Sequence, residues 1–177
     1  MSWNKYLKIP NLFSPSRKEV DTVLLSYGPC SVLDVGAGYG RLSKLLQQNG
    51  FTVTSIDNNE KMVTHLRKER LKAQLMDARK LKFPSNSFEL VVTDGLLEHF
   101  EDPFPIIKEE ARVTRRWVLN LVPRKMLLNA VLEKVQRVPM EHRRSEEEWH
   151  SLHKRLFSRV TITKLTRLLA IQCEKST

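Results

Sequence analysis

Several features that would place this chain in a special class are scarce or absent. No apolar run in its 177 residues approaches the roughly 20 that a membrane-spanning helix requires. The N-terminus lacks the charged-then-apolar order of a signal peptide. The two cysteines, Cys30 and Cys173, lie far apart and show no metal-ligand spacing. We therefore expect a single-domain cytoplasmic protein with reduced cysteines and no membrane span.

Charge of one sign dominates, but only in part of the chain. The formal net charge is +10. Residues 1–107 hold 14 Lys or Arg against 12 Asp or Glu, whereas residues 108–177 hold 16 against 8. A basic surface can attract nucleic acid, an anionic membrane or an anionic substrate, and it can also serve solubility alone. The charge balance leaves these alternatives open.

The chain has only six glycines, and three of them stand at alternate positions in the stretch V-L-D-V-G-A-G-Y-G-R-L, residues 32–42. A short apolar run precedes them and an apolar helical pattern follows, which predicts a strand, a tight turn and a helix. Glycine allows a positive φ or a close ligand approach at such a turn. The dinucleotide motif G-x-G-x-x-G would need its third glycine at position 41, where Arg41 stands. The remaining alternatives are another nucleotide site or a turn without a ligand.

Three successive predicted strands end near an acidic residue: Asp34, Asp57 and Asp77. Asp57 follows Gly36 by 21 residues, the interval at which a β-α-β unit returns a carboxylate to a ribose. In an open parallel sheet, ligands bind beyond the carboxyl ends of the strands. We therefore expect the glycine turn and these carboxylates to meet in one crevice.

The hydrophobic periodicity predicts alternating strands and helices, and hence an α/β fold with one mostly parallel sheet covered on both faces. The expected strands are 31–34, 51–57, 73–76, 88–93 and 117–122. The expected helices are 16–27, one after the glycine turn, one capped by Asn59, one after Pro103, 125–138, one capped by Ser145, and a last one capped by Thr161 or Thr163.

Four segments together resemble the small class I S-adenosylmethionine-dependent methyltransferases often called type 11. They are V-L-D-V-G-A-G-Y-G at 32–40, S-I-D-N-N at 55–59, L-M-D-A at 75–78 and L-L-E-H-F-E-D-P at 96–103. The resemblance covers roughly residues 31–122. It implies a Rossmann-like methyltransferase fold, S-adenosylmethionine as cofactor and S-adenosylhomocysteine as product.

The resemblance also implies which residues bind the methionine and ribose parts of the cofactor. Gly36, Ala37 and Gly38 would approach the methionine part, and Asp34 would support that turn. Asp57 would hold the ribose, because a carboxylate can accept both ribose hydroxyls at once.

Other parts of the cofactor would contact residues further along the chain. Asn58 and Met62 would border the adenine, and Asp77 with Ala78 would contact its amino group. Thr93 and Asp94, where the fourth strand ends, would face the sulfonium end.

One histidine is a candidate general base for methyl transfer. His99 follows the fourth strand, and its ordinary pKa suits proton transfer near neutral pH. Its alternative role is to organise the loop through a hydrogen bond. Three other histidines, His142, His150 and His153, lack the companions of a metal site, so we expect no metal.

The C-terminal part departs from the family pattern. After a last helix, residues remain for only one of the family's two final strands. We therefore expect an abbreviated sheet edge or a chain that stops short. The expected single domain, 1–177, divides into an N-terminal strap and helix (1–30), a cofactor-binding core (31–123), a helical insertion serving as acceptor lid (124–160), and a last helix with an edge strand (161–177).

Three functions remain as hypotheses. The first is methyl transfer to a small-molecule or lipid-like acceptor, with an anionic acceptor compatible with the charge. The second is an RNA or protein methyltransferase that uses the basic C-terminal half. The third is a cofactor-binding or partner-binding module without catalysis. The methyl acceptor and the oligomeric state are not specified by the sequence.

Overall fold

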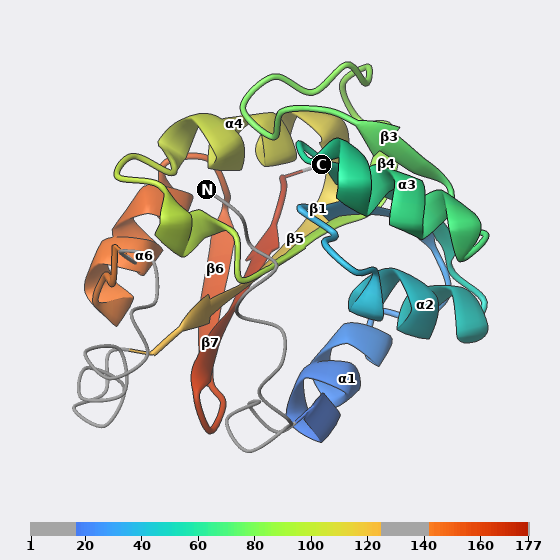
Figure 1. The fold of residues 1–177 in the computed structure, drawn as a ribbon. Helices are drawn as coiled ribbons and strands as arrows, with labels where there is room; N and C mark the ends of the chain where they lie inside the picture. Colours follow the sequence, from blue (N-terminus) through green and yellow to red (C-terminus); the bar gives the residue numbers. More distant parts are fainter. Residues whose placement is uncertain (1–16, 125–141, 177) are drawn as a thin grey trace, which may run out of the picture.

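The structure is a computed structural model that describes residues 17–124 and 142–176. Seven strands form its sheet (Figure 1). They are β1 (Ser31–Val35), β2 (Thr52–Asp57), β3 (Ala73–Leu75), β4 (Phe88–Asp94), β5 (Thr114–Pro123), β6 (Arg159–Lys164) and β7 (Leu168–Glu174). The helices are α1 (Arg17–Leu25), α2 (Arg41–Gln48), α3 (Glu60–Lys68), the 3-10 helix η2 (Leu97–His99), α4 (Phe104–Val113) and α6 (Glu146–Lys154).

The strands are ordered β3-β2-β1-β4-β5-β7-β6. The first five in this order are parallel, and β7 is antiparallel to both of its neighbours. Val35, the last residue of β1, lies in register with Ile56 on β2 and Thr93 on β4. The carboxyl ends of the three strands therefore meet at one edge, with the glycine turn between them.

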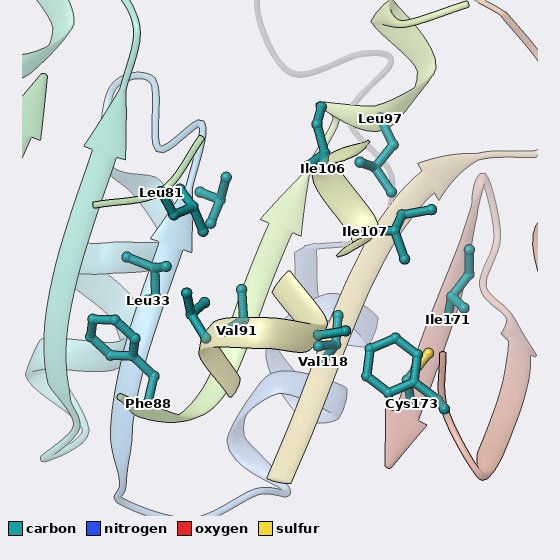
Figure 2. Close-up of a cluster of buried hydrophobic side chains, with 14 of the residues drawn as sticks. Leu33, Leu81, Phe88, Val91, Leu97, Ile106, Ile107, Val118, Ile171 and Cys173 are labelled. Carbon is teal, nitrogen blue, oxygen red and sulfur yellow. The ribbon is translucent and has the colours of Figure 1, made fainter. Parts of the chain in front are cut away.

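Both faces of the sheet are covered, as an α/β fold requires. One apolar cluster packs α4 and α6 against one face, and a second packs α1 and α2 against the other. Figure 1 shows α4 and α6 together on one side and α1 and α2 on the other. Figure 2 shows the first cluster, which includes Leu33, Val91 and Val118 of three neighbouring strands and Ile106 and Ile107 of α4. The predicted mostly parallel sheet with helices on both faces is confirmed.

The last predicted helix, capped by Thr161 or Thr163, is wrong. The chain forms β6 and β7 there, joined by a short turn in which Leu165 N–H donates to the Leu168 carbonyl at 2.9 Å. The alternation of Val160 and Ile162 with polar residues is the period of a strand. β7 pairs with β5 from Trp117 to Pro123, so the sheet edge is complete and not abbreviated.

Several expectations fall outside the described residues. These are the N-terminal strap at 1–13 and the helix at 125–138.

The helix capped by Ser145 is confirmed, because the Ser145 hydroxyl accepts the Glu148 N–H and the Glu148 carboxylate accepts the Ser145 N–H. No helix in the described part of the chain is long and apolar enough to cross a membrane. Both cysteines are free thiols.

Candidate functional site

A cavity of about 390 Å³ opens at the carboxyl ends of β1, β2 and β4. It lies where the sequence predicts a ligand crevice. Its walls come from the glycine turn, the ends of β2 and β3 with the segments after them, and the segment after β4. The lining residues are Gly36, Gly38, Tyr39, Ile56, Asp57, Asn58, Asn59, Met62, Met76, Asp77, Ala78, Arg79, Gly95, Leu96, His99 and Phe100.

The glycine turn bends back onto the end of β2. The N–H groups of Gly36 and Ala37 both donate to the Ile56 carbonyl, at 2.9 and 3.0 Å. Gly36 has φ +73°, and a Cβ there would lie 3.0 Å from a methyl group of Leu96. Glycine is therefore required at this position both by backbone conformation and by the wall opposite. The bare backbone of the turn lets Leu96 pack directly against it.

The Asp57 carboxylate is held at the base of the cavity by two main-chain donors. Its Oδ2 accepts the Gly38 N–H at 2.9 Å, and its Oδ1 accepts the Asn59 N–H at 2.8 Å. Each carboxylate oxygen has two lone pairs, so each retains one for a further donor. Two neighbouring hydroxyl groups, such as those of a ribose, fit this pair of acceptors. Asn59 also caps α3 by accepting the Lys61 N–H at 3.0 Å.

An apolar compartment lies beside Asp57. Ile56, Met62, Met76 and Ala78 contribute to its walls. Cavities of this kind suit a planar aromatic ring, which gains from burial against aliphatic and thioether groups. The Asp77 carboxylate stands at the rim of this compartment.

The opposite end of the cavity is formed by the segment after β4. Gly95, Leu96, His99 and Phe100 line it. Burial lowers the pKa of His99, and a hydrogen bond to the Gly95 main chain opposes that effect in part. The imidazole is therefore neutral near pH 7. A neutral imidazole held by a main-chain hydrogen bond can act as a base or as an organiser of this loop.

Asp34 and Ala37 do not line the cavity. Asp34 lies within β1, one residue before its end, and its Oδ2 accepts the Ser43 hydroxyl at 2.5 Å. Burial raises the pKa of Asp34 to about 6, although the Ser43 hydrogen bond opposes it. Asp34 thus links β1 to α2 below the glycine turn. Of the three carboxylates expected in the crevice, only Asp57 and Asp77 line it. Ala37 packs against the apolar cluster around α3.

Thr93 and Asp94 are also placed behind the cavity wall. Thr93 is buried, and its hydroxyl accepts a hydrogen bond from the Asn120 amide at 2.9 Å. Asp94 pairs with Arg41 of α2 at 3.4 Å, and Arg41 pairs more closely with Asp21 of α1 at 2.9 Å. Burial raises the pKa of Asp94, while Arg41 lowers it. These two residues position Gly95 and do not line the cavity themselves.

The sequence reasoning missed half of the cavity-lining residues. Each lies within two residues of a predicted site residue or within the L-L-E-H-F segment, so proximity to a strand end was the available signal. The missed residues are Tyr39, Ile56, Asn59, Met76, Arg79, Gly95, Leu96 and Phe100.

The segment before α6 is attached to the cavity wall. His142 N–H donates to the Glu98 carbonyl at 2.7 Å, and the Arg144 guanidinium donates to the main-chain carbonyls of Phe100 and Glu101. Arg144 also lies over the Trp149 ring at 5.2 Å. In residues 17–124 and 142–176, no three His, Cys, Asp or Glu side chains are grouped to hold a metal ion.

Comparisons with known proteins agree with this geometry. The family model described as "Methyltransferase domain" matches residues 33–117. The ubiquinone biosynthesis O-methyltransferase of Coxiella burnetii (strain Dugway 5J108-111) is 30% identical over 121 residues, covering 64% of this chain and 52% of that protein. The phosphatidylethanolamine N-methyltransferase of Cereibacter sphaeroides is 36% identical over 93 residues, covering 48% and 45%. The chain spans about half the length of these curated relatives.

Solved structures show the same fold. The PH0226 protein from Pyrococcus horikoshii OT3 superposes with a TM-score of 0.77 at 22% identity, covering 91% of this chain and 90% of that one. Magnesium protoporphyrin IX methyltransferase from Synechocystis PCC 6803 with bound SAH gives a TM-score of 0.74 at 20% identity, covering 90% and 81%. Residues 33–117 thus match the methyltransferase domain family, and the sheet order and the glycine turn facing Asp57 agree with that match.

Proposed function

We propose that the chain transfers a methyl group from S-adenosylmethionine to a small-molecule or lipid-like acceptor. The observation that carries this proposal is the meeting of Gly36, Gly38, Asp57 and Asp77 in one cavity whose far wall holds His99. The names of the curated relatives, which include a ubiquinone biosynthesis O-methyltransferase, a demethylmenaquinone methyltransferase and a phosphatidylethanolamine N-methyltransferase, support an acceptor of this class.

The chain's residues fit the cofactor part by part. The bare turn at Gly36 and Gly38 receives the methionine part, Asp57 accepts the ribose hydroxyls, and the apolar compartment around Met62 encloses the adenine. Asn58 borders the ring. The cofactor supplies a methyl group bonded to a positively charged sulfur, so transfer depends chiefly on alignment with the acceptor. Orientation of this kind is worth on the order of 7 to 11 kcal/mol in favourable cases.

We assign the role of general base to His99. The neutral imidazole takes a proton from the attacking acceptor group as the methyl carbon is transferred, which leaves an imidazolium that releases the proton to water. Leu96 and Phe100 beside it present apolar surface, which disfavours water at the point of transfer. Acceptors with a weakly acidic hydroxyl benefit most from such a base.

Acceptor choice would then reside in the segment after β5, residues 124–160. Its described part contacts the cavity wall through His142 and Arg144, which supports a role as acceptor lid. An anionic acceptor is compatible with the basic charge of this half. Arg143 and Arg144 are half-buried against the wall, an arrangement that does not favour RNA binding over a small acceptor.

The proposal is tested by incubating the protein with methyl-labelled S-adenosylmethionine and separate lipid, small-molecule, RNA and protein fractions of a cell extract. Label should enter the lipid or small-molecule fraction, and His99→Gln should lose most of this transfer. Label in RNA or protein alone would contradict the acceptor class. A protein that binds the cofactor but labels no fraction would support the non-catalytic alternative.

A further inference from the structure

The guanidinium of Arg144 lies against the main chain that follows His99. Its Nη1 and Nη2 each donate to the Phe100 carbonyl at 3.4 Å, and Nη2 also donates to the Glu101 carbonyl. Nη1 donates in addition to the His142 carbonyl at 3.2 Å. His99 and Phe100 both line the cavity. A side chain from the segment before α6 therefore holds the cavity wall at the residues directly after the candidate base.

This part of the wall has little secondary structure of its own. The 3-10 helix η2 is a single turn that ends at His99, and Phe100 is already extended, with φ −113° and ψ 130°. The last carbonyl groups of a helix lack intrahelical partners. The segment before α6 supplies donors at this point, because the His142 N–H donates to the Glu98 carbonyl at 2.7 Å and Arg144 reaches the carbonyls that follow. The path of the chain after η2 is therefore set by residues more than 40 positions away in sequence.

Arg144 is itself fixed on two sides. Its guanidinium carbon lies 5.2 Å from the centre of the Trp149 ring, a cation–π contact with a side chain that is only 1% exposed. Its main chain directly precedes Ser145, which forms the capping box of α6 with Glu148. The guanidinium carries five N–H donors in a rigid planar fork. Arg144 can therefore hold two neighbouring carbonyls at once with little further loss of side-chain freedom.

The His99 ring is tied to the sheet on the other side of η2. It forms a hydrogen bond with the main chain of Gly95, whose N–H donates to the Leu121 carbonyl of β5 at 3.0 Å. After η2, the next helix is α4, which begins at Phe104. Arg144 contacts the chain between these two points. The candidate base thus lies on a short segment that is anchored before it by the sheet and after it by Arg144.

We propose, on the basis of the function proposed above, that Arg144 is a positioning residue for methyl transfer. It does not line the cavity, so it acts through the main chain of Phe100 and Glu101, which it holds so that the His99 imidazole stays at the cavity wall. Displacing a reacting group by about 1 Å can cost on the order of 100-fold in rate. Cofactor binding at Asp57, at the other end of the cavity, does not depend on this contact. A purely structural Arg144 would stabilise the fold without affecting the base.

The first measurement needs no acceptor. NMR of the histidine side chains in the full chain gives the pKa of His99, whose signal is assigned by its absence from His99→Gln. In the wild type, burial lowers this pKa below its ordinary value. In Arg144→Ala and Arg144→Lys the pKa should rise toward that value, because the freed segment exposes the ring to water. Lysine keeps the charge over Trp149 but lacks the planar fork that reaches two carbonyls.

Arg116→Ala is the matched control. It also removes an arginine that lies over a tryptophan ring, 3.9 Å from the centre of Trp117, but near the amino end of β5. It should leave both the pKa of His99 and the rate of methyl transfer unchanged.

The second measurement is the rate of methyl transfer at saturating methyl-labelled S-adenosylmethionine, with the lipid and small-molecule fractions of a cell extract as acceptors. Arg144→Ala should lower this rate on the order of 10- to 100-fold. Calorimetry should give an affinity for S-adenosylhomocysteine within about twofold of the wild type. In the His99→Gln background, Arg144→Ala should cause little further loss, because a residue that acts through His99 has no base left to position. If Arg144→Ala does not fold, Arg144→Lys takes its place in each comparison.

The results separate this inference from the function on which it depends. If the folded Arg144 variants keep either the wild-type pKa of His99 or the wild-type rate, the inference is overturned and the proposed function stands. Losses that multiply in the double variant, or an equal loss in Arg116→Ala, would overturn it as well. A wild-type rate in His99→Gln would remove both the base and its positioning residue, while methyl transfer itself would stand. If the wild type neither binds S-adenosylhomocysteine nor labels any fraction, the proposed function is contradicted together with the inference.

Discussion

The Asp57 carboxylate and the Gly38 N–H are joined by a 2.9 Å hydrogen bond across 19 residues of sequence. This bond ties the end of β2 to the glycine turn that follows β1. A second main-chain donor, Asn59 N–H at 2.8 Å, fixes the other carboxylate oxygen. The carboxylate is thus oriented before any ligand arrives, which reduces the entropic cost of binding.

Replacing Asp57 by alanine should weaken S-adenosylhomocysteine binding by about 1 to 3 kcal/mol, because charge-assisted hydrogen bonds to the ribose are lost. Asp57→Asn should lose less, since one acceptor oxygen remains. Glu60→Ala, an exposed change three residues away, serves as the control and should bind like the wild type. Calorimetry measures all three, and an Asp57→Ala affinity equal to the wild type would remove Asp57 from the site.

Gly40 should tolerate no side chain. It has φ +77°, and a Cβ would lie 2.5 Å from Leu66 Cδ2 and 2.8 Å from Leu71 Cδ1. Gly40→Ala therefore combines left-handed backbone strain of about 1 to 2 kcal/mol with overpacking of about 1 to 3 kcal/mol. Gly28→Ala is the matched control, because Gly28 has φ +70° but no atom within 4 Å of its Cβ position. Urea unfolding should show a clearly larger loss for Gly40→Ala; equal losses would contradict the packing argument.

Glu110 should make the protein less stable as the pH rises. It is fully buried in α4, both its oxygens accept the Asn120 amide at 2.9 and 3.1 Å, and burial raises its pKa to about 8. The folded state therefore holds a proton that the unfolded state releases above about pH 4.5. The free energy of unfolding should fall between about pH 5 and pH 8, on the order of several kcal/mol in all.

Glu110→Gln should flatten this dependence and be more stable than the wild type at pH 9. The neighbouring Glu109 provides a control of opposite sign, because its hydrogen bonds with Arg112 lower its pKa. Glu109→Gln should lose stability at neutral pH, and that loss should disappear as Glu109 becomes protonated in acid. Unfolding by urea measures both slopes, from about pH 4 to pH 9 for Glu110 and below about pH 4.5 for Glu109. If the free energy of unfolding of Glu110→Gln depends on pH as strongly as that of the wild type, the pH dependence comes from another group.

The His99→Gln variant should keep its affinity for S-adenosylhomocysteine while the kcat for methyl transfer falls about 10²- to 10⁴-fold. Since burial lowers the pKa of His99, the base stays neutral to a lower pH than an ordinary histidine would. The fall of wild-type transfer in acidic solution should therefore begin at a lower pH than an ordinary histidine base would give. A kcat that is unaffected by the substitution would leave His99 as an organiser of the loop.

The core of the fold could be predicted because its signals are local. The glycine turn, the cap at Asn59 and the strand that ends at Asp57 each follow from residues adjacent in sequence, and all three are confirmed. The last two strands could not be predicted in the same way. The leucines at 165, 168 and 169 fit a helix as well as a strand pair, and the pairing of β7 with β5 joins residues about 50 apart.

The residues of the candidate site could likewise be predicted only in part. Asp57 and Asp77 line the cavity because strand ends in a parallel sheet meet at one edge. The turn after β3 and the path after β4 depend on side-chain contacts that no spacing specifies. Nearness to a strand end therefore indicates the neighbourhood of Arg79 and Phe100, but not that they line the cavity. The ion pair of Asp77 with Arg79, with 2.7 Å between Oδ2 and Nη2, is visible only in three dimensions.

The central claim is that an adenosyl ligand occupies the cavity between the glycine turn and Asp57. Two-dimensional NMR of the ¹⁵N-labelled chain, titrated with S-adenosylhomocysteine, tests it most directly. The largest amide shifts should occur at Gly36, Gly38, Asn58, Ala78 and Gly95, with little change in β6. Shifts confined to β6 and α6, or no shifts at saturating ligand, would contradict the account.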